Sequence, residues 1–327
     1  MDYVLISGGL LLLAAGGEIL VRGSIKISQR LGVSALLISA VVIGFGTSAP
    51  ELLVSVKASL VGKTDMALGN VVGSNIANIL LILGIAAVIS PIHCKSKAIH
   101  RDALAVVVAS FALFGLSYLQ VISHIAGGIM LTVLVGYLFY AYKTDQRGEF
   151  PKASAKFIDT THEKQGEAFN VNIGLVSSII MSILGIVMLL FGADYMVEGA
   201  THLARRFGIS EAVIGLSLLA VGTSLPELAT AISAAIKKNS DVIIGDILGS
   251  NLFNILSILG ITSLIDPIPI KGQIATFDIP FMLGIAVVTF LIIFFFNKLN
   301  RVTGVISLCL YIAYMAWLST HGAVPVG

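Results

Sequence analysis

Two matching segments decide the fold of this chain: Gly46-Thr47-Ser48-Ala49-Pro50-Glu51 and Gly222-Thr223-Ser224-Leu225-Pro226-Glu227. The second begins 176 positions after the first, and the same offset aligns residues 16–91 with 192–267 without a gap. More than a third of the aligned positions are identical. A second pair of segments keeps the same offset, namely Gly73-Ser74-Asn75-Ile76-Ala77-Asn78 and Gly249-Ser250-Asn251-Leu252-Phe253-Asn254. The chain therefore contains an internal repeat.

Composition places this repeat in a membrane. Of 327 residues, 57% are hydrophobic and 12% are charged, with a mean hydropathy of +0.98. Soluble domains carry about 25% charged residues, so a polytopic membrane protein is expected. The net charge of +2 and the scattered basic residues argue against nucleic-acid binding. Two cysteines are too few for a disulfide framework or a metal cage.

A membrane-spanning helix needs about 20 apolar residues. Ten stretches qualify and predict an all-α protein; they lie near 3–25, 33–60, 66–90, 102–119, 123–142, 172–198, 209–236, 241–265, 275–296 and 302–320. The first is too long for the apolar region of a signal peptide and has no basic residue before Arg22, so it counts as a span.

Basic residues then predict the orientation, because cytoplasmic loops carry more of them. With both termini outside the cytoplasm, fifteen of the 20 lysines and arginines fall on the cytoplasmic side. Residues 143–171 form the one long polar linker, on that side, between a first half (1–142) and a second half (172–327). The offset covers five spans, an odd number, so the second copy enters the membrane from the opposite side. Two inverted five-helix repeats are typical of secondary transporters.

Glu51 and Glu227 are expected in the middle of the second and seventh spans. An ionised carboxylate at that depth costs about 2.5–3.5 kcal/mol on insertion scales and needs a partner. No lysine or arginine is near the middle of spans two, three, seven or eight, so a transported cation is the expected partner.

The neighbouring residues offer oxygen ligands, which hard cations such as calcium and sodium prefer. Hydroxyl or amide side chains four residues apart should share a helix face with each other or with a glutamate. These pairs are Thr47 with Glu51, Ser74 with Asn78, Thr223 with Glu227, and Ser250 with Asn254. Pro50 and Pro226 lack an N–H and should unwind their helices locally.

Two further features accompany the motifs. Asp246 replaces Asn70 in the second copy, one helical turn before Ser250, where it could guide ions. Glycine pairs spaced by four, Gly69/Gly73 and Gly245/Gly249, should let the third and eighth spans pack closely.

The sequence contains no phosphate-binding loop and no hydrolase or zinc-protease motif, which argues against an ATP-driven pump or an enzyme.

At its G-T-S-x-P-E and G-S-N-x-x-N segments the chain resembles the cation/calcium exchanger family, in particular sodium/calcium exchangers of bacterial and archaeal type. The resemblance extends over both repeats. It implies that Glu51 and Glu227 are the central ligands for calcium and sodium. It also implies further ligands from the hydroxyls, amides and carbonyls of the two copies: Thr47, Thr223, Ser74, Ser250, Asn78, Asn254, Ser48, Ser224, Gly44 and Ala220. The family works by alternating access, in which the first and sixth helices slide across a fixed core.

One departure from the family concerns charge. Some members carry an aspartate at one of the positions held here by Asn78 and Asn254. The ligand set expected from the motifs thus has one negative charge fewer, which leaves the number of sodium ions open and argues against potassium co-transport.

The expected function is calcium/sodium antiport across a bacterial or archaeal inner membrane, with the two ions and the bilayer as partners. No cofactor and no obligatory protein partner are expected. An exchanger of protons for calcium or another divalent cation is an alternative, since protons could neutralise the same carboxylates, and a passive cation channel is a more distant one.

Overall fold

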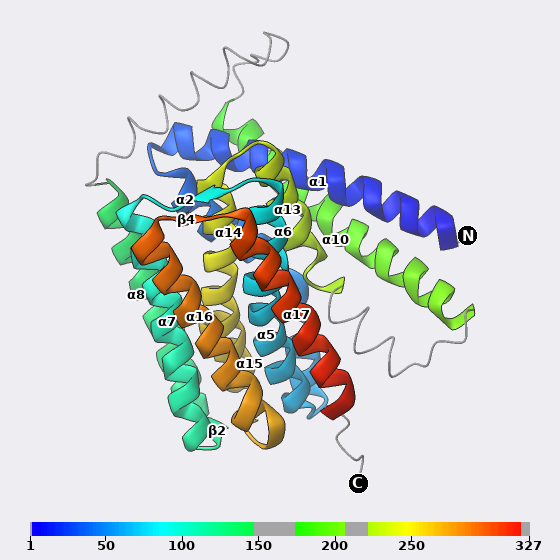
Figure 1. Cartoon of the computed structure of the whole chain (residues 1–327), viewed down its shortest axis with the longest axis vertical. Coiled ribbons are helices and arrows are strands. Elements are labelled where there is room, and N and C mark those ends of the chain that lie inside the picture. The colour runs from blue at the N-terminus through cyan, green and yellow to red at the C-terminus, as the bar shows by residue number, and fades with distance from the viewer. Residues whose placement is uncertain (1, 147–173, 207–221, 322–327) are drawn as a thin grey trace.

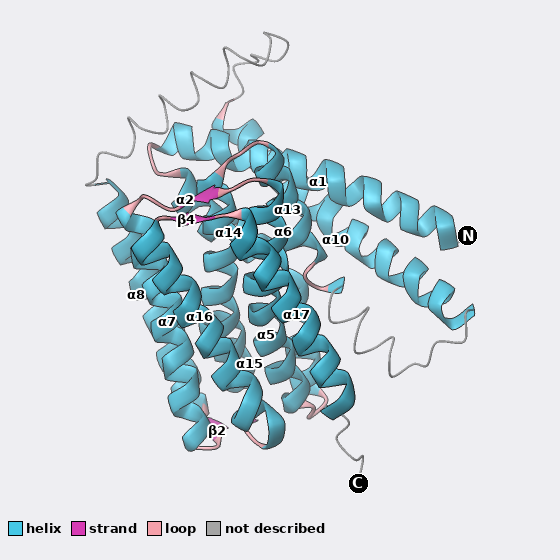
Figure 2. Ribbon diagram, in the orientation of Figure 1, coloured by secondary structure: helices cyan, strands magenta, loops and turns pink. Residues whose placement is uncertain are grey.

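The computed structural model describes residues 2–146, 174–206 and 222–321. Its first half contains α1 (Asp2–Leu31), α2 (Ala35–Ile38), η1 (Ser39–Ile43), α3 (Gly44–Thr47), α4 (Ala49–Leu60), α5 (Thr64–Ala77), η2 (Asn78–Ile82), α6 (Leu83–Ile89), α7 (Lys97–Tyr118) and α8 (His124–Gln146). The second half contains α10 (Leu175–Arg206), α13 (Leu225–Ile236), α14 (Ser240–Leu252), η4 (Phe253–Ile258), α15 (Leu259–Ile265), η5 (Ile274–Asp278), α16 (Ile279–Phe296) and α17 (Arg301–His321). Figure 2 shows the predominance of helix.

Eight helices in the described residues are long and apolar enough to span a membrane. A ninth span is formed if Ala35–Thr47 and Ala49–Leu60, which meet at a bend of 45°, are counted together. Of the predicted span 209–236, the structure describes α13, and residues 209–221 lie outside the described part. The prediction of an all-helical polytopic membrane protein is therefore confirmed, although the count of ten is not established.

The part of the chain that the structure describes also contains four strands that were not predicted, each two residues long: β1 (Ile92–His93), β2 (Val121–Ile122), β3 (Ile268–Pro269) and β4 (Lys298–Leu299). β1 pairs with β4 and β2 pairs with β3, both antiparallel. The two pairings lie at opposite ends of the bundle (Figure 1). Each strand pair therefore joins a connection from the first half to one from the second half.

Several elements in the two halves have the same limits at an offset of 176. α4 matches α13, α6 matches α15, and β1 matches β3 at both ends. The π-helical segments η2 and η4 both end at the matching positions Ile82 and Ile258. The sequence repeat is thus also a repeat of local structure.

The helices α1 and α10 lie side by side, tilted relative to the other helices (Figure 1). Their contact is made by glycines seven residues apart. A Cβ at Gly9 would lie 2.7 Å from the Gly192 carbonyl oxygen, and one at Gly16 would lie 3.0 Å from that of Gly185. Such close backbone approach is typical of helix pairs in membranes. The hydrophobic effect does not drive helices together there, and small residues allow close van der Waals packing instead. The pair therefore packs as one antiparallel unit.

The predicted close packing at glycine pairs is found in the second half. A Cβ at Gly245 would lie 2.5 Å from the Leu36 carbonyl oxygen, and one at Gly249 would lie 2.5 Å from Ala40 Cα. Within the described residues, a Cβ at Gly69 would lie 3.7 Å from Ile274 Cδ1, and one at Gly73 would meet no atom of another segment within 4 Å. The backbone segment Leu36–Ala40 corresponds at the repeat offset to residues 212–216, which lie outside the described part.

The cysteine that follows β1 gives a first testable prediction. Cys94 is fully buried outside the spanning helices, and this burial raises the pKa of its thiol to about 12. At pH 8 only about one thiol in 10⁴ would be the reactive thiolate. In a Cys309→Ser variant, which removes the exposed second cysteine, we expect no maleimide labelling of the folded protein and complete labelling in SDS. Rapid labelling of the folded variant would contradict this.

Candidate functional site

Each predicted site glutamate lies in the first turn of a short helix. The helix of the second span is interrupted at Ser48 (φ −80°, ψ 7°), and α4 then begins with Pro50 and Glu51 in its first turn. Ser224 has nearly the same conformation (φ −89°, ψ 8°) before α13. The expected local unwinding is confirmed, but Thr47 and Glu51 do not share a continuous helix face, because the break separates them. A carboxylate in the first turn is favoured by the helix dipole.

The two glutamates are fully buried, and hydroxyls from the opposite copy of the motif contact them. Ser48 donates a hydrogen bond to Glu227 Oε1 at 3.0 Å, and Ser224 donates to Glu51 Oε1 at 3.3 Å. Ser74 adds a longer bond of 3.5 Å to Glu51 Oε1. The Oε2 atoms of both glutamates have no hydrogen-bond partner among the described residues. The structure thus brings both motif copies together and leaves one buried oxygen of each carboxylate unsatisfied.

The side-chain amides of Asn78 and Asn254 also leave buried polar atoms without hydrogen-bond partners among the described residues. Asn78 donates to Asn251 Oδ1 at 2.9 Å, while its own Oδ1 is buried without a partner in the described part. Asn254 is fully buried, and neither end of its amide has a described partner. The Thr223 hydroxyl is likewise buried and unpaired within these residues. Buried polar groups are normally hydrogen-bonded, so these orphaned atoms mark a site for a ligand.

Another part of the predicted set gathers where α3 meets α14. Thr47 donates to the Ile43 carbonyl oxygen at 3.0 Å, and Ser250 donates to the Gly44 carbonyl oxygen at 3.2 Å. A Cβ at Gly44 would come within 2.9 Å of the Ser250 backbone nitrogen, so only glycine permits this approach. The predicted carbonyl of Ala220 lies outside the described residues.

Asp246 also lies where α3 meets α14, although the ligand set expected from the motifs did not include it. It is fully buried; Thr230 donates to its Oδ2 at 2.6 Å, and Thr47 Oγ1 lies 3.5 Å from its Oδ1. The sequence signal is the exchange of Asn70 for Asp246 between the copies. Because Asp246 is fully buried and acidic, this exchange identifies it as a third intramembrane acid beside the predicted ligands.

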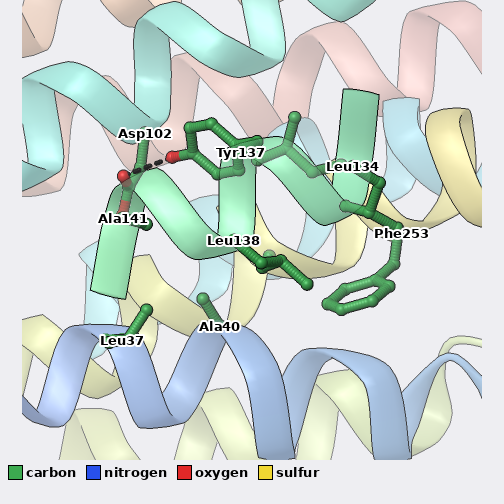
Figure 3. A pocket seen from close by; sticks show the side chains of 10 residues that line it. Leu37, Ala40, Asp102, Leu134, Tyr137, Leu138, Ala141 and Phe253 are labelled. Atoms are coloured by element: carbon green, nitrogen blue, oxygen red, sulfur yellow. Dashed lines mark hydrogen bonds between the residues drawn. The ribbon is translucent and has the colours of Figure 1, made fainter. Parts of the chain in front are cut away.

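Two other acidic residues, the buried Asp102 and the partly exposed Glu18, are paired with basic residues of the protein. Asp102 contacts Arg101 Nη2 at 2.7 Å and accepts a hydrogen bond from Tyr137 beside a small, mainly apolar pocket between α2, α8 and α14 (Figure 3). Glu18 pairs with Arg22 at 2.5 Å, as its spacing of four suggests, and with Lys237 at 2.7 Å.

The three acids at the candidate site differ from these. Within the described residues, no Lys, Arg or His nitrogen lies within 4.0 Å of the carboxylates of Glu51, Glu227 or Asp246. An unpaired charge in the membrane interior is costly. The site can therefore bind positive charge through carboxylate, hydroxyl, amide and carbonyl oxygens.

Comparison with known proteins agrees with this chemistry. The family model described as "Sodium/calcium exchanger protein" matches residues 1–143 and 177–320. The putative antiporter CaxA of Alkalimonas amylolytica is 32% identical over 94% of this chain and 95% of its own length. The sodium/calcium exchanger MaX1 of Methanosarcina acetivorans is 28% identical, with coverage of 97% and 98%.

A solved structure of the sodium-calcium exchanger NCX_Mj, soaked with Na⁺ and Sr²⁺, has a TM-score of 0.82 to this chain. It is 30% identical and covers 96% of this chain and 97% of its own. The family model thus matches most of the sequence, and the fold agrees with that of the solved exchanger structure. The chain belongs to the sodium/calcium exchanger protein family.

Proposed function

We propose that this protein is an antiporter that exchanges Na⁺ for Ca²⁺ across the membrane, with Glu51 and Glu227 as the central ion ligands. One observation carries the proposal: two fully buried glutamates from the two motif copies, each contacted by a serine of the other copy and neither paired with a described basic residue. The family membership supports a calcium-exchange antiporter as the functional class.

The electrostatics support obligatory exchange by alternating access. Two ionised carboxylates without positive charge would be costly to carry through an occluded state. One calcium or two or more sodium ions would neutralise them, so only loaded forms would cross. The pair α1 and α10 is suited to move as a unit, because its glycines join the two helices closely to each other; α1 also contacts α13, through the Glu18–Lys237 ion pair.

The proposed architecture has ten spans in two inverted halves, 1–142 and 172–327, joined by a cytoplasmic linker at 143–171. The matching limits of α4 with α13 and α6 with α15 support the repeat. Five spans in each half would reverse the direction of the second copy, which agrees with a pseudo-two-fold relation between Ser48–Glu227 and Ser224–Glu51. The distribution of basic residues supports termini outside the cytoplasm.

The proposed ligands are the twelve residues expected from the motifs: Glu51, Glu227, Thr47, Thr223, Ser74, Ser250, Asn78, Asn254, Ser48, Ser224, Gly44 and Ala220. Calcium and sodium bind there as cargo, with the bilayer as the surrounding partner and with no separate cofactor. Transport then needs no nucleophile or enzymatic step.

Flux in reconstituted vesicles tests the proposal. Proteoliposomes loaded with Na⁺ at equal pH on both sides should accumulate ⁴⁵Ca²⁺ when diluted into Na⁺-free buffer, and uptake should saturate with external Ca²⁺. Uptake should cease when the Na⁺ gradient is removed. Calcium movement driven only by a pH gradient would favour the proton exchanger instead, and downhill calcium flux without any counter-ion would favour a channel.

A further inference from the structure

The contact between α1 and α10 is symmetric under the internal repeat. The backbone of Gly9 approaches that of Gly192, and the backbone of Gly16 approaches that of Gly185. Adding 176 to Gly9 and Gly16 gives Gly185 and Gly192, so the offset exchanges one contact for the other. The pair of helices therefore has two equivalent faces, one on each helix.

Only the face on α1 is attached to α13. A Cβ at Gly17 would lie 2.9 Å from the carbonyl oxygen of Ala229. Next to this contact, Glu18 accepts a hydrogen bond from Ser233 at 3.0 Å and forms an ion pair with Lys237 at 2.7 Å. Close backbone approach and opposite charge thus hold α1 against α13 in this structure.

The equivalent face of the other half is uncovered. Three positions on and just after α4 correspond to the positions of α13 that α1 contacts, and all three side chains are exposed: Leu53 at 57%, Lys57, and Val61 at 69%. The counterpart of Glu18 on α10 is Asp194, which is exposed as well. In the part of the chain that the structure describes, no Lys, Arg or His nitrogen lies within 4.0 Å of the Asp194 carboxylate.

An exposed carboxylate at Asp194 is costly where it stands. Asp194 belongs to the candidate span Leu175–Ala200, and an unpaired acid within a span is unfavourable. The repeat provides its partner. Lys57 corresponds to Ser233 at the offset of 176, and Ser233 is the residue that lies 3.0 Å from the Glu18 carboxylate. If α10 packs on α4 as α1 packs on α13, Asp194 meets a lysine.

The two acidic contacts belong to opposite ends of the bundle. α13 ends close to β1, since the His93 N–H donates to Ser240 Oγ at 3.0 Å. α4 ends close to α15, the helix before β3, since Ser59 lies 3.4 Å from the Thr262 carbonyl oxygen. The β1–β4 and β2–β3 pairings lie at opposite ends of the bundle (Figure 1). Attachment of the helix pair to α13 or to α4 therefore closes different ends.

We propose that Glu18 with Lys237 and Asp194 with Lys57 are two alternative ion pairs. The first holds the state seen here, and the second holds the state in which α10 has packed against α4. Because α1 and α10 are joined closely, their pair attaches at one place at a time. This inference rests on the proposed exchange function and names the side chains that hold its two end states. Glu18 and Asp194 thus position helices and do not bind the transported ions.

Cross-linking tests whether α10 reaches α4. In a Cys309→Ser background, Asp194→Cys is combined with Lys57→Cys, and the reference variant combines Glu18→Cys with Ser233→Cys, whose native side chains are 3.0 Å apart. We expect a short bismaleimide to join the two introduced thiols within one chain in both variants, in proteoliposomes supplied with Na⁺ and Ca²⁺. Cross-linking of the reference variant alone would overturn the proposal.

Charge exchange tests the ion pair itself. Asp194→Lys should lower maximal Na⁺-driven ⁴⁵Ca²⁺ uptake by about three- to five-fold, the range expected for a partly exposed ion pair. Adding Lys57→Asp should restore uptake, because the opposite charges face each other again. Lys63→Asp is the matched control, since Lys63 is exposed and follows α4 closely, and it should not restore uptake. Equal uptake by the single and the exchanged variants would overturn the ion pair.

A neutralising pair of variants covers the case in which Asp194→Lys fails to elute as a monodisperse protein. Asp194→Asn and Lys57→Gln should each lower uptake, and their combination should lower it no further than either alone. Additive losses would overturn the ion pair. Absence of Na⁺-driven calcium flux in the wild type would instead refute the proposed function, so the two failures are distinguishable.

Discussion

Replacing Glu51 or Glu227 by glutamine is expected to abolish calcium exchange and leave the protein folded. Glutamine has nearly the same shape, and its side-chain oxygen can still accept the bond from Ser224 or Ser48. The change removes one of the two negative charges proposed to bind calcium. Loss of one member of a buried charge pair costs about 2–5 kcal/mol, which corresponds to a loss of affinity of about 30-fold or more.

Folding should not suffer, because the wild-type protein buries both carboxylates completely without a described basic partner. A neutral glutamine amide removes the free-energy cost of burying a charge, although its two hydrogens need hydrogen-bond acceptors. We therefore expect the glutamine variants to keep a thermal midpoint in detergent close to that of the wild type. Calcium, however, should no longer raise that midpoint.

The measurements are ⁴⁵Ca²⁺ uptake in proteoliposomes and thermal unfolding with and without calcium. Glu198→Gln is the matched control, because Glu198 is an exposed glutamate on α10. It should transport like the wild type. Near-normal uptake by Glu51→Gln or Glu227→Gln would remove these residues from the centre of the site.

Much of this arrangement follows from sequence because the membrane limits the alternatives. Apolar segments in lipid must be helical to satisfy their backbone groups, so the element type could be predicted. The internal repeat provides information that a single copy of the motif lacks. The correspondence between Ser48-Ala49-Pro50 and Ser224-Leu225-Pro226 indicates a helix break at the same position in each half, and both breaks are found there.

The limits of the prediction are also physical. Periodicity shows which residues share a face only while the helix is continuous, and the break at Ser48 ends that continuity between Thr47 and Glu51. The sequence around a residue does not show which residue, distant in the chain, it pairs with. The position of Lys237 indicates only a helix end, and its partner Glu18 is far away in sequence. The exchange of Asn70 for Asp246 is visible in the repeat, but the contact of Asp246 with Thr47 depends on the packing of α3 against α14.

That packing leads to the second large effect. Gly249→Ala is expected to destabilise the protein and impair exchange together. The added Cβ would lie 2.5 Å from both the Cα and the carbonyl oxygen of Ala40. These are backbone atoms of η1, which cannot rotate away as a side chain could. Overpacking of a tight interface costs about 1–3 kcal/mol, and here relief requires η1 to move.

Movement of η1 would reach the ion site directly, since η1 continues into α3 with Gly44 and Thr47. Gly136→Ala on α8 is the control, because Gly136 is exposed and alanine improves helix propensity there by up to about 1 kcal/mol. We expect the thermal midpoint of Gly249→Ala to fall by several degrees, with a reduced maximal ⁴⁵Ca²⁺ uptake, whereas Gly136→Ala keeps both. If Gly249→Ala matched the wild type in both measurements, η1 would have room to yield, and the close contact could not be what positions Gly44 and Thr47.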